Sequence, residues 1–477
     1  MSLAKVILGN DHSTALAITA AALLAGLVAI LGPHALTLLV GLGGLLILLC
    51  YPLVALLAYL FFLYHPVISH ISTLSGLVAQ VSFWLHVLLY KKRVRGDVCF
   101  ILLAAYAAVI IMSALLNGSL LGKSALYVLH AVYYSLFLIL FINLINTKAR
   151  LRLLIHFFVV IAVLQAVVGI LEYFLNVELF HLAAKGDEVK IGTEFNVRST
   201  GTLLDPNIYA LYLQFTLPFP IALWITRHDW KAGKILPLFF FLILLGLILG
   251  YTRSTFISLM IIAAVLLLNN IRTRYTLFIV LGSAIIVSIL LAVSPAIMDR
   301  LKSIGELSDV KLSDESSSLA VRFRQYQGFF YLVQQQPVLG IGAGNFYIKS
   351  YHYNPRAREG EEVNNMFMHV VTDAGLLGLA IYLAILATTW RNLLLSQKIA
   401  AALGDAEMVI YIRALKYALG LTLIAVQAMS GYFLFPLVLS ISLSVAIKYI
   451  LLDQSAAGAT GLELISKPPF GPGLNAS

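Results

Sequence analysis

The sequence predicts an all-α, polytopic membrane protein, and three observations lead to this fold class. Hydrophobic residues make up 61% of the 477 residues and charged residues only 11%, whereas soluble domains are about half apolar and about one quarter charged. The apolar residues form continuous runs close to the roughly 20 residues of a membrane-spanning helix, and not the alternating segments of a membrane β-barrel. Because a backbone in lipid must satisfy its own hydrogen bonds, these runs are expected to be helices.

The apolar runs predict twelve to fourteen transmembrane helices. The first run begins near Thr14, behind a leader whose only Lys or Arg is Lys5, and no small-residue cleavage site follows it, so we interpret it as a retained helix and not a signal peptide. The second and third runs are short and meet at Cys50–Pro52, which predicts a shallow hairpin. The runs lie at roughly 15–31, 34–49, 51–64, 74–90, 98–115, 124–145, 152–175, 207–226, 235–250, 253–269, 274–293, 365–391, 410–430 and 434–452.

Basic residues occur in alternate connections between these runs, as expected of loops on the cytoplasmic side. They are Lys91, Lys92, Arg93 and Arg95, then Lys148, Arg150 and Arg152, then Arg227, Lys231 and Lys234, then Arg272 and Arg274, and finally Arg391 and Lys398. This alternation predicts that both termini are cytoplasmic and that the long polar connections are extracytoplasmic. Because the net charge of +10 is spread over helix ends, nucleic acid is not an expected partner, and the lipid bilayer is.

Cys50 and Cys99 lie in or beside apolar runs and suggest neither a disulfide nor a metal site.

The predicted organisation has six parts. The parts are N-terminal transmembrane helices (1–175), an extracytoplasmic connection (176–206), central helices that carry Arg253 (207–293), a long periplasmic loop with an interfacial helix (294–364), C-terminal helices (365–452) and a disordered cytoplasmic tail (453–477).

Within the long loop, Ala320–Gln336 mixes polar and aromatic residues in a way that suits a helix lying on the membrane surface. Glycine and proline residues then interrupt the pattern over Pro337–Phe346. The sequence GIGAGNF follows no strand and lacks a following lysine, so it is predicted to be a tight turn and not a phosphate loop.

Three arginines are predicted on the extracytoplasmic side: Arg198, Arg253 and Arg322. A single arginine at this depth is explained by snorkelling towards the interface. Three on the same leaflet instead favour an anion site, because each guanidinium group can donate two hydrogen bonds to phosphate oxygens. The arginines therefore predict a diphosphate-binding site.

Four separated segments resemble the bacterial O-antigen ligase and O-antigen polymerase family. They are Arg198 with Gly201 and Pro206-Asn207, then Thr252-Arg253-Ser254, then Arg322 followed by Pro337–Gly342, and then Asn365 followed by Asp373, Gly375 and Gly378. The resemblance covers roughly 198–386. It implies an integral-membrane glycosyltransferase of the GT-C type, independent of metal and cofactor, that transfers a glycan from undecaprenyl diphosphate with inversion. It also implies that the three arginines hold the diphosphate.

One position departs from the pattern of the family. Ligases of the family usually have His-Asn at the start of the helix after the long loop, and Asn364 stands in the place of that histidine. Because asparagine cannot act as a general base, either Glu362 or Glu361 takes the proton or the reaction needs little base assistance. The resemblance adds Asn365 as a third candidate catalytic residue. A solvated acidic loop near a helix N-terminus remains an alternative explanation for the two glutamates.

Other polar residues near this position are candidate acceptor or sugar contacts: Asn364, His369, His352 and Tyr326. His369 lies five residues after Asn364 and therefore on another helical face, so we expect it to be a packed core histidine. Tyr326 shares a helical face with Arg322, since the two residues are four positions apart.

These observations favour a polysaccharide polymerase of the bacterial inner membrane, with its active site facing the periplasm. The expected partners are an undecaprenyl-diphosphate-linked donor, a lipid-linked glycan acceptor and a chain-length regulator. An O-antigen ligase that uses a lipid A core acceptor is the close alternative. A transporter is the alternative of another class, but the apolar runs carry few buried charges beyond Glu172 and Lys416.

Overall fold

A computed structural model describes twelve segments of the chain: 43–63, 69–118, 123–177, 179, 188–191, 194–203, 205–226, 235–270, 281–283, 318–353, 362–431 and 434–466. The predicted helix at 15–31, most of the one at 274–293, Glu361 and the end of the tail lie outside these segments.

The all-α membrane class predicted from the sequence is confirmed. Within the described segments, eight helices are long and apolar enough to cross a membrane, and the total is nine if a bent pair counts as one span. The bent pair joins Gly43–Cys50 to Pro52–Leu63 at an angle of 117°, at the position of the predicted shallow hairpin.

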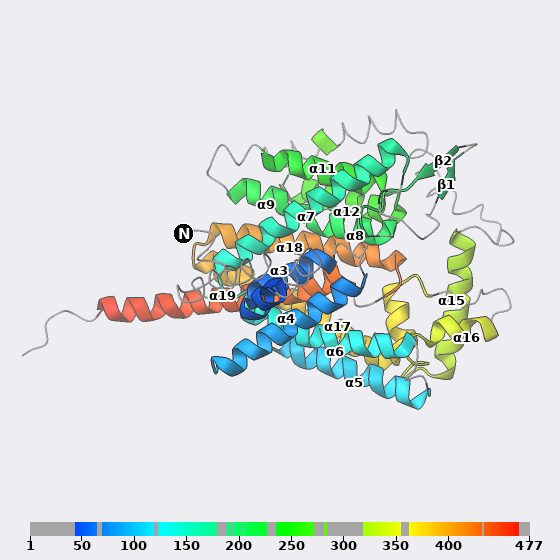
Figure 1. Ribbon diagram of the computed structural model, residues 1–477, viewed down its shortest axis with the longest axis horizontal. Coiled ribbons are helices and arrows are strands. Elements are labelled where there is room, and N and C mark those ends of the chain that lie inside the picture. The colour runs from blue at the N-terminus through cyan, green and yellow to red at the C-terminus, as the bar shows by residue number, and fades with distance from the viewer. Residues whose placement is uncertain are drawn as a thin grey trace, which may run out of the picture.

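The helices form two groups on either side of a central set (Figure 1). One group contains α3 (Pro52–Leu63), α4 (Ser69–Leu89), α5 (Val98–Leu116) and α6 (Lys123–Leu144). The other contains α7 (Lys148–Leu175), α8 (Pro206–Thr216), α9 (Pro218–Thr226), α11 (Ile235–Leu249) and α12 (Arg253–Asn270). The central set contains α17 (Met366–Ala402), α18 (Ala406–Ala425) with the short η3 (Val426–Ala428), and α19 (Phe435–Ser466).

The central set joins the two groups. Helix α17 packs against α5 and α19, whereas α18 packs against α8, α9 and α12. Burial follows this arrangement, because 83% of the apolar window of α19 is buried but only 33% of that of α4. Helix α19 is therefore the most enclosed of the candidate membrane-spanning helices among the described residues.

Capping residues fix where several of these helices begin. Asp97, Thr147, Asp205, Asn365 and Asp405 precede α5, α7, α8, α17 and α18, and the side chain of each accepts hydrogen bonds from backbone N–H groups of the first turn. These N–H groups have no partner inside the helix, so a short polar side chain stabilises the helix start.

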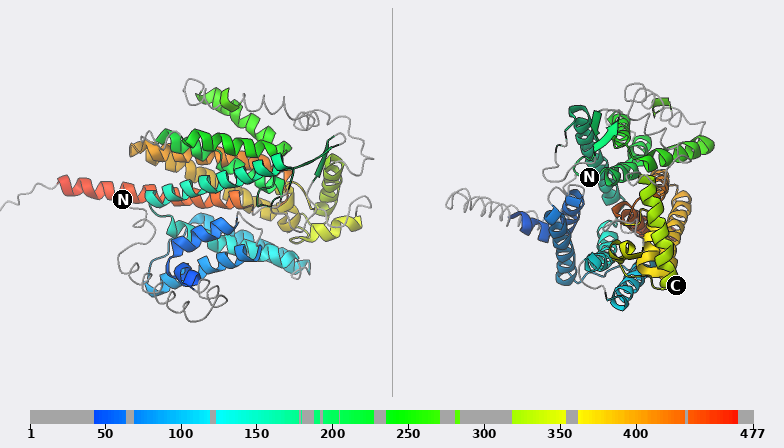
Figure 2. Two further views of the ribbon diagram at one scale, coloured as in Figure 1. Left: turned by 45° about the horizontal axis from the view of Figure 1, so that its top comes forward. Right: turned by 90° about the vertical axis from the view of Figure 1, so that its right-hand side faces the viewer.

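Helix α15 (Ser318–Gln335) runs across one end of the bundle, with α16 (Asn345–Tyr353) beside it (Figure 2). We call this the α15 end. The hairpin of β1 (Glu188–Ile191) and β2 (Glu194–Val197) lies at the same end and is antiparallel. The hairpin was not expected from the sequence, which indicated only an irregular connection there.

Helix α17 is broken at Gly375, which has φ 67° and ψ −168°. The turn after α15 fills the break: Leu376 and Leu377 donate backbone hydrogen bonds to Pro337 and Val338, and Ile341 donates one to Thr372. The predicted tight turn is therefore present, and it closes against the broken helix instead of standing alone.

Ion pairs join the connections at the opposite end of the bundle. Arg95 pairs with Asp453, Lys148 with Asp405, and Arg152 with Glu407. Two differences from the sequence interpretation also appear there. Helix α17 continues to Ala402, so Arg391 and Lys398 are helical residues, and α19 continues to Ser466, so the tail predicted to be disordered from residue 453 begins as a helix.

Candidate functional site

Arg198 is held against the turn between α11 and α12. Its side chain is 7% exposed. Its Nε and Nη2 atoms donate to the backbone oxygen of Gly250 at 3.3 and 3.2 Å, and Nη2 also donates to Thr252 Oγ1 at 3.4 Å. Arg198 therefore contacts the residue immediately before Arg253, although the two arginines are far apart in sequence.

Arg253 is the first residue of α12. Its side chain is partly buried, and the positive charge of Arg322 acts on it. The Nε atom of Arg253 is buried and has no hydrogen-bond partner among the described residues. Two nearby positive charges, together with a buried N–H group that lacks an acceptor, cost free energy unless an anion accompanies them.

Arg322, on α15, reaches the end of α18. Its Nη2 atom donates to the backbone oxygen of Ala428 at 3.4 Å. Arg198 is thus bonded to the turn that precedes Arg253, and Arg322 is close enough to act on the charge of Arg253. The structure brings the three arginines to one neighbourhood at the α15 end.

The start of α17 lies beside the same part of α18. Asn365 caps α17 by accepting from the N–H groups of Phe367 and Met368 at 3.1 and 3.2 Å, and its Nδ2 atom donates to the side-chain and backbone oxygens of Gln427 at 3.3 Å. Gln427 adjoins Ala428, the partner of Arg322. Asn365 is therefore a capping residue that also contacts the segment holding Arg322.

Asn364, in the place of the family histidine, is bonded to α15. Its backbone N–H and its Nδ2 atom both donate to Gln325 Oε1 at 3.2 Å. Gln325 is itself 4% exposed. The pair fixes α15 against the start of α17.

Glu362 is partly buried and accepts a hydrogen bond from Tyr127 Oη at 3.2 Å. The Tyr127 ring stands edge-on to the His369 ring, with 5.6 Å between their centroids. Glu362 is thus anchored by the neutral hydroxyl of Tyr127, and a carboxylate can accept more hydrogen bonds than this one.

His369 is 2% exposed. Its Nδ1 atom accepts from the Gly431 N–H at 2.8 Å, and its Nε2 atom lies 3.3 Å from Asp373 Oδ2. Both ring nitrogens therefore have partners within the protein, which matches the packed and hydrogen-bonded histidine expected from the sequence.

For two of the remaining candidate residues, the structure gives the helix on which each one lies. Tyr326 is partly buried on α15, one turn after Arg322, and His352 lies in α16. Glu361 is outside the described segments. Sequence reasoning did not single out Tyr127, Gln325 or Gln427, because each is a common residue type inside a helical pattern and becomes notable only through its long-range contact.

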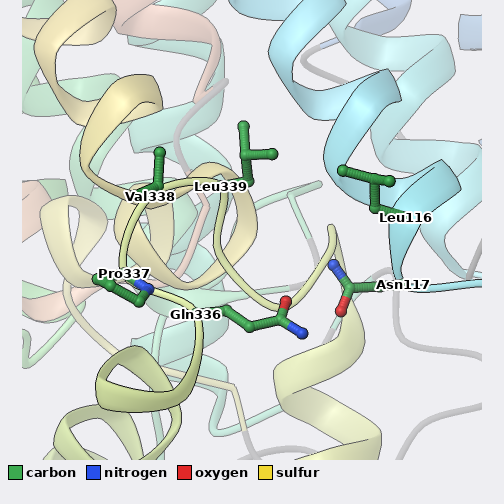
Figure 3. A pocket seen from close by; sticks show the side chains of 6 residues that line it. All are labelled: Leu116, Asn117, Gln336, Pro337, Val338 and Leu339. Atoms are coloured by element: carbon green, nitrogen blue, oxygen red, sulfur yellow. The ribbon is translucent and has the colours of Figure 1, made fainter.

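A pocket lies between the C-terminal end of α5 and the turn after α15 (Figure 3). Leu116, Asn117 and residues 336–339 line it. Asn117 Nδ2 donates to the backbone oxygen of Gly340 at 3.3 Å, so the two walls are joined. The residues that line this pocket include none of the predicted site residues.

Comparison with known proteins identifies the segment that carries most of this site. Residues 238–383 match the family model described as O-antigen ligase. A search of curated proteins found no significant match. The matched segment includes Arg253, Arg322 and Glu362, whereas Arg198 lies outside it. Over residues 238–383, the chain is therefore similar to the O-antigen ligase family.

Proposed function

We propose that this protein transfers a glycan from an undecaprenyl-diphosphate-linked donor to an acceptor sugar hydroxyl, with inversion, and that it polymerises polysaccharide repeat units. The observation that carries the proposal is the proximity of three arginines: Arg198 is bonded to the turn before Arg253, Arg322 acts on the charge of Arg253, and the buried Nε atom of Arg253 lacks a partner among the described residues. A diphosphate would supply acceptors for these guanidinium groups and offset their charge.

The proposed reaction needs a good leaving group and a proton acceptor. The acceptor hydroxyl attacks the anomeric carbon, the new glycosidic bond forms on the face opposite the diphosphate, and the bond from the anomeric carbon to the diphosphate oxygen breaks. The arginines stabilise the negative charge that develops on the departing undecaprenyl diphosphate. Glu362 accepts the hydroxyl proton, and Tyr127 orients its carboxylate.

We further propose that the α15 end faces the periplasm and that the protein lies in the bacterial inner membrane with both termini in the cytoplasm. The basic residues of the connections at 91–95 and 148–152 support this orientation, because they gather in ion pairs at the opposite end of the bundle. In this orientation, the arginines meet a donor lipid in the outer leaflet. A chain-length regulator remains a candidate partner.

The ligase alternative is favoured by the similarity of residues 238–383 to the O-antigen ligase family. Asn364 favours the polymerase, since it replaces the histidine that ligases of the family usually carry. Incubating the purified protein with lipid-linked oligosaccharide alone separates the two functions. Chain lengthening without a lipid A core acceptor supports the polymerase, whereas transfer only after that acceptor is added supports the ligase.

The test of the diphosphate site is the Arg253→Ala variant. Removing one preorganised donor to the leaving group is expected to lower kcat by about 10²–10³-fold. Arg95→Ala is the matched control, because Arg95 makes an ion pair with Asp453 at the opposite end of the bundle. Full glycan transfer by folded Arg253→Ala would overturn the proposed site.

A further inference from the structure

Glu172, near the C-terminal end of α7, is a fully buried carboxylate in an apolar helix. Its Oε2 atom accepts hydrogen bonds from two consecutive backbone N–H groups, that of Thr200 at 2.9 Å and that of Gly201 at 2.8 Å. A charged group inside a membrane bundle is costly and generally serves a function. The partners of this one lie in the segment that follows Arg198.

The rest of this segment is fixed to the same face of α7. Gln165 accepts from the Thr202 N–H at 2.9 Å and donates to the Thr202 hydroxyl. Ser199 Oγ donates to the backbone oxygen of Gly169 at 2.6 Å. Residues 165, 169 and 172 are spaced by four and three positions and so share one helical face. We call residues 199–202 the tethered segment.

The contact between Gly201 and α7 leaves little space. Gly201 has φ +57°, and a Cβ atom added there would lie 2.5 Å from Gln165 Oε1. The tethered segment is therefore closely fitted to α7, and Arg198 emerges from it towards Gly250 and Thr252. A continuous set of contacts runs from α7 through the tethered segment and Arg198 to the turn that precedes Arg253.

We infer that Glu172 is a positioning residue for the donor diphosphate: it fixes the tethered segment and thereby orients Arg198 and the turn that presents Arg253. This inference rests on the proposed function. Glu172 suits the role because a carboxylate accepts two N–H bonds at once, with bonds stronger than those of a neutral acceptor. Its Oε2 atom faces backbone donors of the tethered segment, so its role is to hold that segment and not to contact the anionic donor.

The test compares variants of the full-length protein in detergent or nanodiscs. Glu172→Gln keeps the side-chain size and one acceptor oxygen, whereas Glu172→Leu removes both acceptors. The matched control is Glu407→Gln, because Glu407 also accepts charged hydrogen bonds, from Arg152, but at the opposite end of the bundle. The probes are undecaprenyl diphosphate and undecaprenyl monophosphate, each without a glycan.

We expect Glu172→Gln to weaken diphosphate binding about tenfold, since loss of charge assistance costs on the order of one hydrogen bond. Glu172→Leu should weaken it further, and monophosphate binding should change less in both variants. In glycan transfer, KM for the donor should rise while KM for the acceptor stays unchanged. Glu407→Gln should leave both KM values unchanged, even where it lowers the thermal unfolding midpoint.

The outcomes distinguish failure of this inference from failure of the proposed function. If the wild-type protein does not bind undecaprenyl diphosphate, or if Arg253→Ala binds it as well as wild type does, the proposed function fails. If Arg253→Ala loses binding but folded Glu172→Gln and Glu172→Leu bind like wild type, only the role of Glu172 is overturned. Equal changes in donor and acceptor KM would likewise show that Glu172 acts only as a general structural anchor.

Discussion

Replacing Gly375 with alanine is expected to separate the turn after α15 from the break in α17. A Cβ atom at this position would lie 2.1 Å from the backbone oxygen of Val338 and 2.5 Å from the backbone nitrogen of Leu339. Both contacts are with backbone atoms, so no side chain can rotate to relieve them. The turn and the helix must therefore move apart.

The expected loss of stability has two parts. Gly375 has φ +67° and ψ −168°, a backbone region that almost only glycine adopts and that costs another residue about 1–3 kcal/mol. The three backbone hydrogen bonds that close the turn against α17 contribute about 0.5–1.5 kcal/mol each, or about 1.5–4.5 kcal/mol together. The sum predicts that Gly375→Ala lowers the free energy of unfolding by about 2.5–7.5 kcal/mol.

Gly404 provides a control with a positive φ and without the backbone contacts. It also has φ +67°, but a Cβ atom added there would meet no heavy atom within 4 Å. Gly404→Ala should therefore cost only the conformational part, about 1–2 kcal/mol. The assay is reversible unfolding of both variants in mixed detergent micelles, with glycan transfer measured on the folded protein.

The difference between the two variants decides the outcome. Gly375→Ala should lose more stability than Gly404→Ala and should also lose transfer activity, because the first half of α17 carries Asn365 at the site. Equal losses of stability would refute the reasoning, since they would show that the contacts with Val338 and Leu339 contribute nothing measurable.

Two further predictions concern single carboxylates. Glu362→Gln is expected to lower kcat by about 10²–10⁴-fold, as for loss of a general base, with unchanged binding of undecaprenyl diphosphate; unchanged kcat would show that the Tyr127–Glu362 contact is only structural. Burial raises the pKa of Asp97, but hydrogen bonds from Lys448, the Cys99 N–H and Tyr449 outweigh it and hold the pKa below its ordinary value. The stability that this group contributes is therefore present above its unfolded pKa of about 3.9 and is lost as pH falls through the lower folded pKa. Asp97→Asn should flatten the acid side of the unfolding-midpoint profile measured by calorimetry, and a profile as steep as that of wild type would assign the acid sensitivity to other groups.

Much of the fold was predictable because hydrophobic patterning is local. The apolar runs indicated membrane helices, and the position of Arg253 directly before an apolar run indicated a helix start, which the structure has at the same residue. The tail beyond Asp453 was harder to predict, because α19 continues there as a helix without the apolar composition that marks its first part.

The candidate site was predictable only as a set of residue types on one side of the membrane. The sequence by itself determined that the chain is an all-α membrane protein whose polar connections carry the candidate residues, three arginines and two glutamates. Only the tertiary structure decided that Arg198 bonds to the turn before Arg253, that Tyr127 bonds to Glu362, and that Glu172 holds the segment after Arg198. The physical reason is that the burial of a helix in lipid depends on residues that are neighbours in the sequence. A hydrogen bond between residues that are distant in the sequence depends instead on how whole helices pack.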